Sequence, residues 1–176
     1  MEQPLGYAVG NWLEVKESID CLNGHGPEDG MEITHLLAGT MIYLGKKASS
    51  VEEGIEMSKK SVDDGSALQK WIDIVEEQGG DSGVVKDPDT YPKAVMIDEV
   101  KSDRSGYVAE MDAFAMGMVS VELGAGRRAK DDDVDPQAGF VLHKKIGDRV
   151  EKGETIAILH TNKEEMLDSA KKGMLD

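Results

Sequence analysis

The chain has 176 residues, with 35 acidic side chains against 20 basic ones, and its formal net charge at pH 7 is −15. Such a charge repels nucleic acid phosphates and anionic lipid surfaces, so we expect neither as a partner. No apolar run approaches the ~20 residues that a membrane-spanning helix needs. The single cysteine, Cys21, cannot form an internal disulfide, and the opening segment shows no export signal. Both features favour a reducing, cytoplasmic setting.

The first half of the chain, to about residue 89, has the periodicity of helices. Apolar residues recur at spacings of three and four with charged residues between them, which is the pattern of an amphipathic helix. The predicted helices cover residues 12–22 with Asn11 as N-cap, then residues 27–47, 50–62 and 66–78. Glycine turns separate several of them, and two consecutive glycines end the last one.

The composition changes at residues 87–92, where two prolines disfavour helix on both sides. We therefore predict two domains, residues 1–90 and 91–176. Beyond the boundary, short β-branched or alternating segments predict strands at residues 94–100, 106–110, 140–144 and 155–160. A helix over residues 111–123, capped by Asp112 and closed by Gly124, interrupts these strands, and another helix is expected after Glu164. The expected fold class is α+β.

Few side chains have the types and spacing of a catalytic or zinc site. The four histidines lie in separate segments and lack the pairing or cysteine partners that zinc needs. No basic cluster near Cys21 in the sequence would lower its pKa, so we expect a buried, inert thiol rather than a nucleophile. The acidic run at residues 131–133 lacks the alternation of a calcium loop.

The loop at residues 124–128 combines two glycines with two arginines. Its backbone amides, beside two guanidinium groups, form a candidate receptor for an anion. The alternative is a helix C-cap followed by a tight turn. The loop is not a dinucleotide-binding fingerprint, because it follows a predicted helix and has Ala129 where the third glycine should stand.

Residues 147–155 have the spacing Gly-Asp-x-Val-x-x-Gly-x-x and precede an apolar strand. This spacing resembles the biotinyl/lipoyl-type barrel-sandwich hybrid, and residues 106–108 would supply its opening strand. In carrier domains of that type a lysine in the following hairpin is acylated, and Lys163 stands near that place. The neighbouring residues typical of the carrier motif are missing, and an ordinary surface lysine is the alternative.

Short motifs along the chain look like the C-terminal part of pyrimidine-nucleoside phosphorylase, the thymidine phosphorylase family. They stand in the family's order, at residues 3–11, 13–17, 79–81, 106–108, 123–127, 135–139 and 142–148. The resemblance runs from Met1 to about Asn162. It implies a helical remnant of a central α/β domain (1–90), followed by an α+β C-terminal domain of barrel-sandwich type (91–176).

The resemblance implies a reversible phosphorolysis, in which inorganic phosphate attacks the anomeric carbon of uridine or thymidine and releases the base and a pentose 1-phosphate. The family's phosphate loop and base-holding residues lie before the matched part. We therefore expect a fragment that is inactive alone, and we assign it no catalytic or cofactor-binding residue. The family forms homodimers, while the state of this chain stays open. The alternative is a stand-alone lipoyl- or biotinyl-like binding or carrier module.

Similarity to the family also implies a partial site for potassium or another hard cation. The matching positions are the backbone carbonyls of Leu5 and Ala8 and the carboxylate of Glu17. Such oxygen ligands suit a hard cation rather than zinc. The remaining ligands would come from a segment before the match, and a solvent-facing helix glutamate is the alternative for Glu17.

Overall fold

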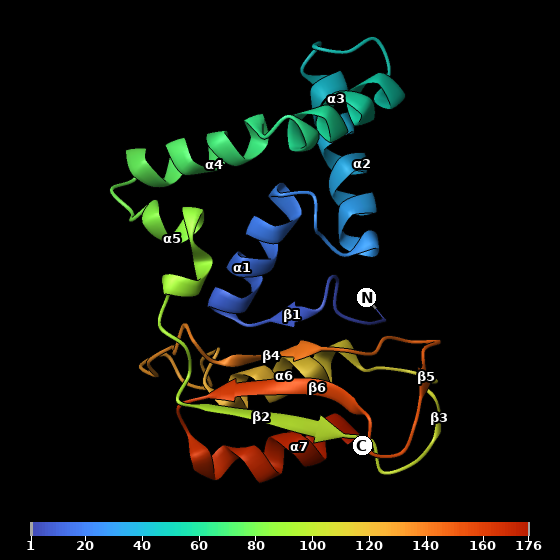
Figure 1. The fold of residues 1–176 in the computed structure, drawn as a ribbon, viewed down its shortest axis with the longest axis vertical. Coiled ribbons are helices and arrows are strands. Elements are labelled where there is room, and N and C mark those ends of the chain that lie inside the picture. The colour runs from blue at the N-terminus through green and yellow to red at the C-terminus, as the bar shows by residue number, and fades with distance from the viewer. Residues whose placement is uncertain (1, 176) are drawn as a thin grey trace. The chain divides into compact units, whose positions relative to one another are not determined.

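The computed structural model describes residues 2–175 (Figure 1). The chain divides into two compact units, Met1–Val15 with Pro92–Asp176, here called the sheet unit, and Lys16–Tyr91, here called the helical unit. Helix α1 (Asn11–Leu22) runs from the first range into the second. The predicted division at residue 90 concerns the domains of the family and stays a prediction. Among the described residues, no helix combines the length and apolar character needed to cross a membrane.

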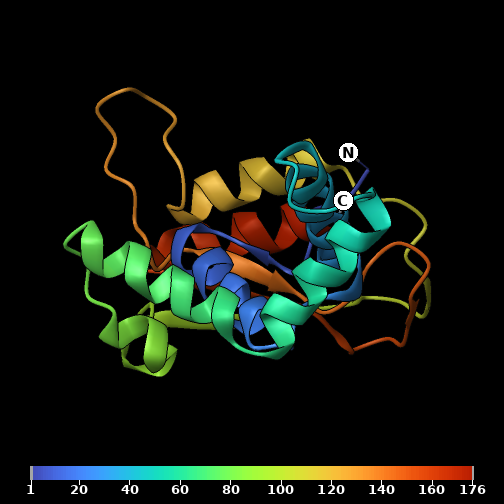
Figure 2. The same cartoon turned by 90° about the horizontal axis from the view of Figure 1, so that it is seen from above.

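The sheet unit consists of an antiparallel sheet, a separate two-stranded ribbon and helices that pack on the sheet. The sheet has the order β1-β4-β6-β2. Its strands are β1 (Ala8–Val9), β4 (Gly139–Leu142), β6 (Thr155–Thr161) and β2 (Met96–Lys101). The ribbon pairs β3 (Gly106–Tyr107) with β5 (Arg149–Val150). Helices α6 (Ala113–Leu123) and α7 (Leu167–Leu175), the latter preceded by the short turn η2 (Glu164–Met166), lie side by side against the sheet (Figure 2).

The core of the sheet unit lies between the sheet and these two helices. Along β6, Ala157, Leu159 and Thr161 alternate with half-buried residues, as a strand with one buried face requires. Phe140 on β4 and Leu123 on α6 are completely buried in the same cluster. Thr161 is also buried, and its Oγ1 donates a 2.6 Å hydrogen bond to the Leu123 carbonyl, so its hydroxyl is satisfied.

The N-terminal segment belongs to this unit because it pairs with β4, far away in the sequence. Ala8 lies opposite Val141 in an antiparallel register. At the end of β1 the backbones approach so closely that a Cβ on Gly10 would lie 2.4 Å from the Ala138 carbonyl oxygen. Glycine is therefore required at Gly10, whose φ is also positive at +139°. This strand was not predicted.

The helical unit holds the helices that follow α1. They are α2 (Glu28–Leu44), α3 (Val51–Asp63), α4 (Ser66–Glu77), α5 (Gly83–Lys86) and the short turn η1 (Pro88–Thr90). Ser50 caps α3, since its side chain accepts a hydrogen bond from the Glu53 amide. Helices α2 and α3 cross at Gly39 and Gly54, where an added Cβ on Gly54 would lie 2.2 Å from the Gly39 carbonyl oxygen.

The mixed α+β arrangement agrees with the predicted fold class. The long helices lie where the periodicity predicted them, and Asp112 caps α6 by accepting hydrogen bonds from Phe114 N at 2.8 Å and Ala115 N at 3.1 Å. Gly124 ends α6 in the left-handed conformation, with φ +116°. The second predicted strand is shorter than expected, since only Gly106 and Tyr107 pair. Helix α5 was not predicted.

Candidate functional site

The residues implied as cation ligands are divided between the two units. Leu5 and Ala8 belong to the sheet unit, where Leu5 is exposed and Ala8 is buried in β1. Glu17 lies on α1, within the range of the helical unit. The three-ligand set therefore stays a prediction, while the geometry around the two carbonyl positions can be described.

The chain around Leu5 is held by residues from the turn after β4. Lys145 is buried, and its Nζ donates a 3.1 Å hydrogen bond to the Pro4 carbonyl. The same Nζ lies 4.9 Å from the centre of the Tyr7 ring, within the range of a cation–π contact. The Ile146 amide donates to Gln3 Oε1 at 3.0 Å. The segment that carries the two carbonyls is thus held in place by Lys145 and Ile146, from a distant part of the chain.

The donor chemistry of this segment fits a hard cation. Within the described residues, the Leu5 carbonyl accepts no hydrogen bond, so its oxygen is available as a ligand. No group of three or more His, Cys, Asp or Glu side chains among these residues could hold a metal ion. Neutral carbonyl oxygens with a single carboxylate suit potassium better than zinc.

The glycine-arginine loop at residues 124–128 is a helix end followed by a turn, which was the alternative to an anion receptor in the sequence analysis. The Ala125 amide donates to Ser120 O at 2.9 Å, which closes α6. The amides of Arg128 and Ala129 both donate to Asp132 Oδ2, at 2.9 Å each. These backbone hydrogen bonds lower the pKa of the Asp132 carboxyl. An external anion at these two amides would have to displace the carboxylate of Asp132.

Lys163 does not stand in a hairpin, where carrier domains have their acylated lysine. It follows the end of β6 and immediately precedes η2 and α7, so the chain continues into helix rather than turning back into a strand. Its amide donates to Thr161 Oγ1 at 3.0 Å. The helix predicted after Glu164 is confirmed by η2 and α7.

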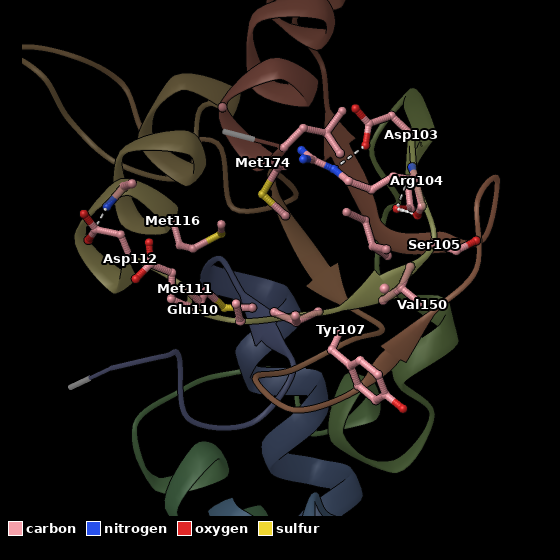
Figure 3. A pocket seen from close by; sticks show the side chains of 18 residues that line it. Asp103, Arg104, Ser105, Tyr107, Glu110, Met111, Asp112, Met116, Val150 and Met174 are labelled. Atoms are coloured by element: carbon pink, nitrogen blue, oxygen red, sulfur yellow. Dashed lines mark hydrogen bonds and ion pairs between the residues drawn. The ribbon is translucent and has the colours of Figure 1, made fainter.

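A pocket of about 710 Å³ lies in the sheet unit, beside the ribbon and the ends of α6 and α7 (Figure 3). Its apolar lining includes Met111, Met116, Val150, Ile156 and Met174. Glu110 and Asp112 lie at one end, and Asp103 and Arg104 at the other, where Arg104 Nε donates to Asp103 Oδ1 at 2.9 Å. No binding role was predicted from the sequence for any of these rim residues, and Asp112 was singled out only as a helix cap.

The polar rim of this pocket is a poor receptor for phosphate. The pocket lining contains three carboxylates, those of Asp103, Glu110 and Asp112, and one guanidinium, that of Arg104. The Asp112 side chain is also occupied as the cap of α6, and the Arg104 side chain is paired with Asp103. An anion entering the pocket would meet net negative charge, which disfavours its binding.

The cysteine and the most perturbed histidine have the environments of structural residues. Burial raises the pKa of the Cys21 thiol, and the neighbouring charges of Glu17 and Asp20 raise it further. Cys21 therefore stays protonated at neutral pH, which makes it a poor nucleophile. Burial lowers the pKa of His160, which favours the neutral imidazole.

Comparison with known proteins shows one matching domain profile and several similar sequences. The sequence profile of the "Pyrimidine nucleoside phosphorylase C-terminal domain" matches residues 107–176. The chain is 48% identical over 172 residues to the pyrimidine-nucleoside phosphorylase of Geobacillus stearothermophilus, and the alignment covers 98% of this chain and 40% of that protein. With the same coverage, identity is 44% to the pyrimidine-nucleoside phosphorylase of Staphylococcus haemolyticus and 43% to one from Staphylococcus aureus.

The chain therefore spans about 40% of the length of these relatives. The alignment includes nearly all of its residues, in both the sheet unit and the helical unit. The matched profile is that of the C-terminal domain and lies at the C-terminal end of the chain. Over nearly all of its length, the chain is similar to the C-terminal part of pyrimidine-nucleoside phosphorylases.

Proposed function

We propose that this chain serves as the C-terminal part of a pyrimidine-nucleoside phosphorylase acting on a pyrimidine nucleoside and inorganic phosphate. In that reaction a phosphate oxygen attacks the anomeric carbon, the bond to the base nitrogen breaks, and the products are the free base and a pentose 1-phosphate. The identity of 48% over 98% of the chain supports the proposal. By the same family analogy, the assembled enzyme is a homodimer, and residues 91–176 form an α+β domain of barrel-sandwich type.

We further propose that the 176 residues do not catalyse this reaction alone. Phosphorolysis needs donors that converge on the phosphate and stabilise charge on the departing base. The observation that carries the proposal is that Asp132 already occupies the two amides of the glycine-arginine loop. The acidic rim of the pocket adds no phosphate receptor. We assign to this chain the packing and support of an active site whose reacting groups lie in the remaining part of the fold.

A complementation assay tests both statements. The chain is incubated with uridine or thymidine and phosphate, alone and after mixing with the part of the Geobacillus stearothermophilus relative that the alignment does not cover. We expect no free base from the chain alone and release of base from the mixture. Turnover that follows the purified chain through successive columns would overturn the proposed inactivity. A silent mixture, with both polypeptides folded and associated, would overturn the proposed role in phosphorolysis.

We also propose that potassium, or another hard cation, binds at the carbonyls of Leu5 and Ala8 with the Glu17 carboxylate. The open Leu5 carbonyl and the oxygen-only donor set support this site. When bound, the cation would supply a fixed positive charge. A potassium chloride titration against choline chloride at constant ionic strength, followed by the thermal unfolding midpoint, tests the site. A midpoint that potassium leaves unchanged, both in the chain alone and in its mixture with the part of the relative that the alignment does not cover, would contradict it.

A further inference from the structure

The segment that carries Leu5 and Ala8 depends on a buried ammonium group from a distant part of the chain. Only 9% of Lys145 is exposed, although a lysine is among the residues most costly to bury. Its Nζ is compensated by the Pro4 carbonyl at 3.1 Å and by the face of the Tyr7 ring at 4.9 Å. These partners flank Leu5 and Gly6 in the sequence. The contacts of Lys145 therefore bracket the position of the Leu5 carbonyl.

The backbone around Lys145 is itself firmly placed. Its amide donates to Asp148 Oδ2 at 2.8 Å, and Asp148 N donates back to the Lys145 carbonyl at 3.0 Å. Gly147, with φ +93°, permits the tight turn between them. The next residue, Ile146, donates its amide to Gln3 Oε1. Two adjacent residues of this turn, Lys145 and Ile146, thus donate hydrogen bonds to two adjacent residues of the N-terminal segment, Pro4 and Gln3.

The other end of the segment is fixed by the sheet. The Leu142 amide donates to the Tyr7 carbonyl at 2.8 Å, and Ala8 then pairs with Val141. Between the two fixed ends the chain bends at Gly6, whose φ is +70°. A short segment held at both ends has few conformations left, so its carbonyl directions are set by the tethers.

We propose that Lys145 is a positioning residue for the cation site, one that orients the carbonyls of Leu5 and Ala8 without being a ligand. This inference rests on the proposed cation site. The positive charge of Lys145 provides a sharp test, because an ammonium group near a bound cation also repels that cation. If positioning dominates, removing the ammonium weakens cation binding. If repulsion dominates, removing the ammonium strengthens it.

The principal variant is Lys145→Met, and its matched control is Lys144→Met. Both changes remove one positive charge, at adjacent positions. The Lys144 Nζ, however, donates to the Arg149 carbonyl at 2.9 Å and pairs with Glu154 Oε1 at 2.7 Å, within the hairpin that contains β5. A long-range charge effect would therefore appear in both variants, whereas a positioning effect appears in Lys145→Met alone.

The first measurement is amide hydrogen exchange of residues 5–8 in the whole chain without potassium. We expect exchange to become about tenfold faster in Lys145→Met, since a hydrogen bond from a charged group is lost. We expect no change in Lys144→Met. Gln3→Ala, which removes the neighbouring tether to Ile146, should accelerate exchange in the same residues. This second variant keeps the test decisive if Lys145→Met fails to fold, as monitored by circular dichroism.

The second measurement is the dissociation constant for potassium, with choline chloride keeping the ionic strength constant. We expect binding about tenfold weaker in Lys145→Met and unchanged in Lys144→Met. Normal exchange together with normal potassium binding in Lys145→Met would overturn the positioning role and leave the cation site standing. Tighter binding in Lys145→Met would overturn it in favour of repulsion. No potassium response in the wild-type chain would instead remove the cation site, and the inference with it.

Discussion

The two units of this chain bury their apolar residues to very different degrees. In the sheet unit, Phe140, Leu123 and Leu159 are completely buried in one cluster between strands and helices. In the helical unit, α2 leaves Leu37 exposed to 59% and Met41 to 71%. A sheet offers its helices a continuous apolar face, and the helices α2 to α5 have no strand of their own unit to pack on. The comparison shows that helical periodicity alone does not provide a core.

The first and largest prediction contrasts the two units directly. Phe140→Ala should lower the free energy of unfolding by about 3–5 kcal/mol, because it leaves a cavity in a fully buried cluster. Leu37→Ala, which also removes an apolar side chain, should change it by no more than about 0.5 kcal/mol. Urea unfolding followed by circular dichroism measures both. Similar losses in the two variants would show that the exposed face of α2 is covered in solution.

The second prediction concerns the place where the helical unit does pack closely. Gly54→Ala should destabilise the protein by about 1–3 kcal/mol, because its Cβ would meet the Gly39 carbonyl at the crossing of α2 and α3. The control, Gly117→Ala on α6, meets nothing within 4 Å and should stabilise by about 0.5–1 kcal/mol through helix propensity. Thermal unfolding of both variants is the measurement. A stabilised Gly54→Ala would mean that the two helices do not cross at these glycines.

Local sequence signals predicted the elements whose causes are local. Asp112 caps α6 and Gly124 ends it, each within a few residues of the apolar pattern that it borders. These signals depend on hydrogen bonds between neighbours in the chain. They were therefore readable without knowledge of the fold, and the structure confirms them.

The features that escaped prediction depend on contacts between distant residues. Strand β1 has two residues and exists because Ala8 pairs with Val141. The contact of Lys145 with Pro4 joins residues 141 positions apart, so no spacing in the sequence indicates it.

The third prediction has the smallest expected effect on stability, and it compares an ion pair between packed elements with one on an exposed helix surface. In the sheet unit, Lys171 Nζ on α7 lies 2.6 Å from Asp98 Oδ2 on β2. The hydrogen bond from Lys171 is the main cause that lowers the pKa of the Asp98 carboxyl. The folded pKa thus lies below the unfolded value of about 3.9, so the stabilisation is complete above that value and is lost as the pH falls through the folded pKa.

Asp98→Asn should therefore cost less than about 1 kcal/mol at pH 7, because the pair is partly exposed. Its urea midpoint should fall less steeply than that of the wild type below pH 4, since the variant has lost the carboxylate whose protonation weakens the fold. The control is Glu56→Gln, which removes the exposed pair with Lys59 on α3 and should leave the midpoint at pH 7 unchanged. If the urea midpoint of Asp98→Asn falls below pH 4 as steeply as that of the wild type, the acid loss of stability comes from other carboxylates. The Asp98 contact would then help to position α7 without contributing to the pH dependence of stability.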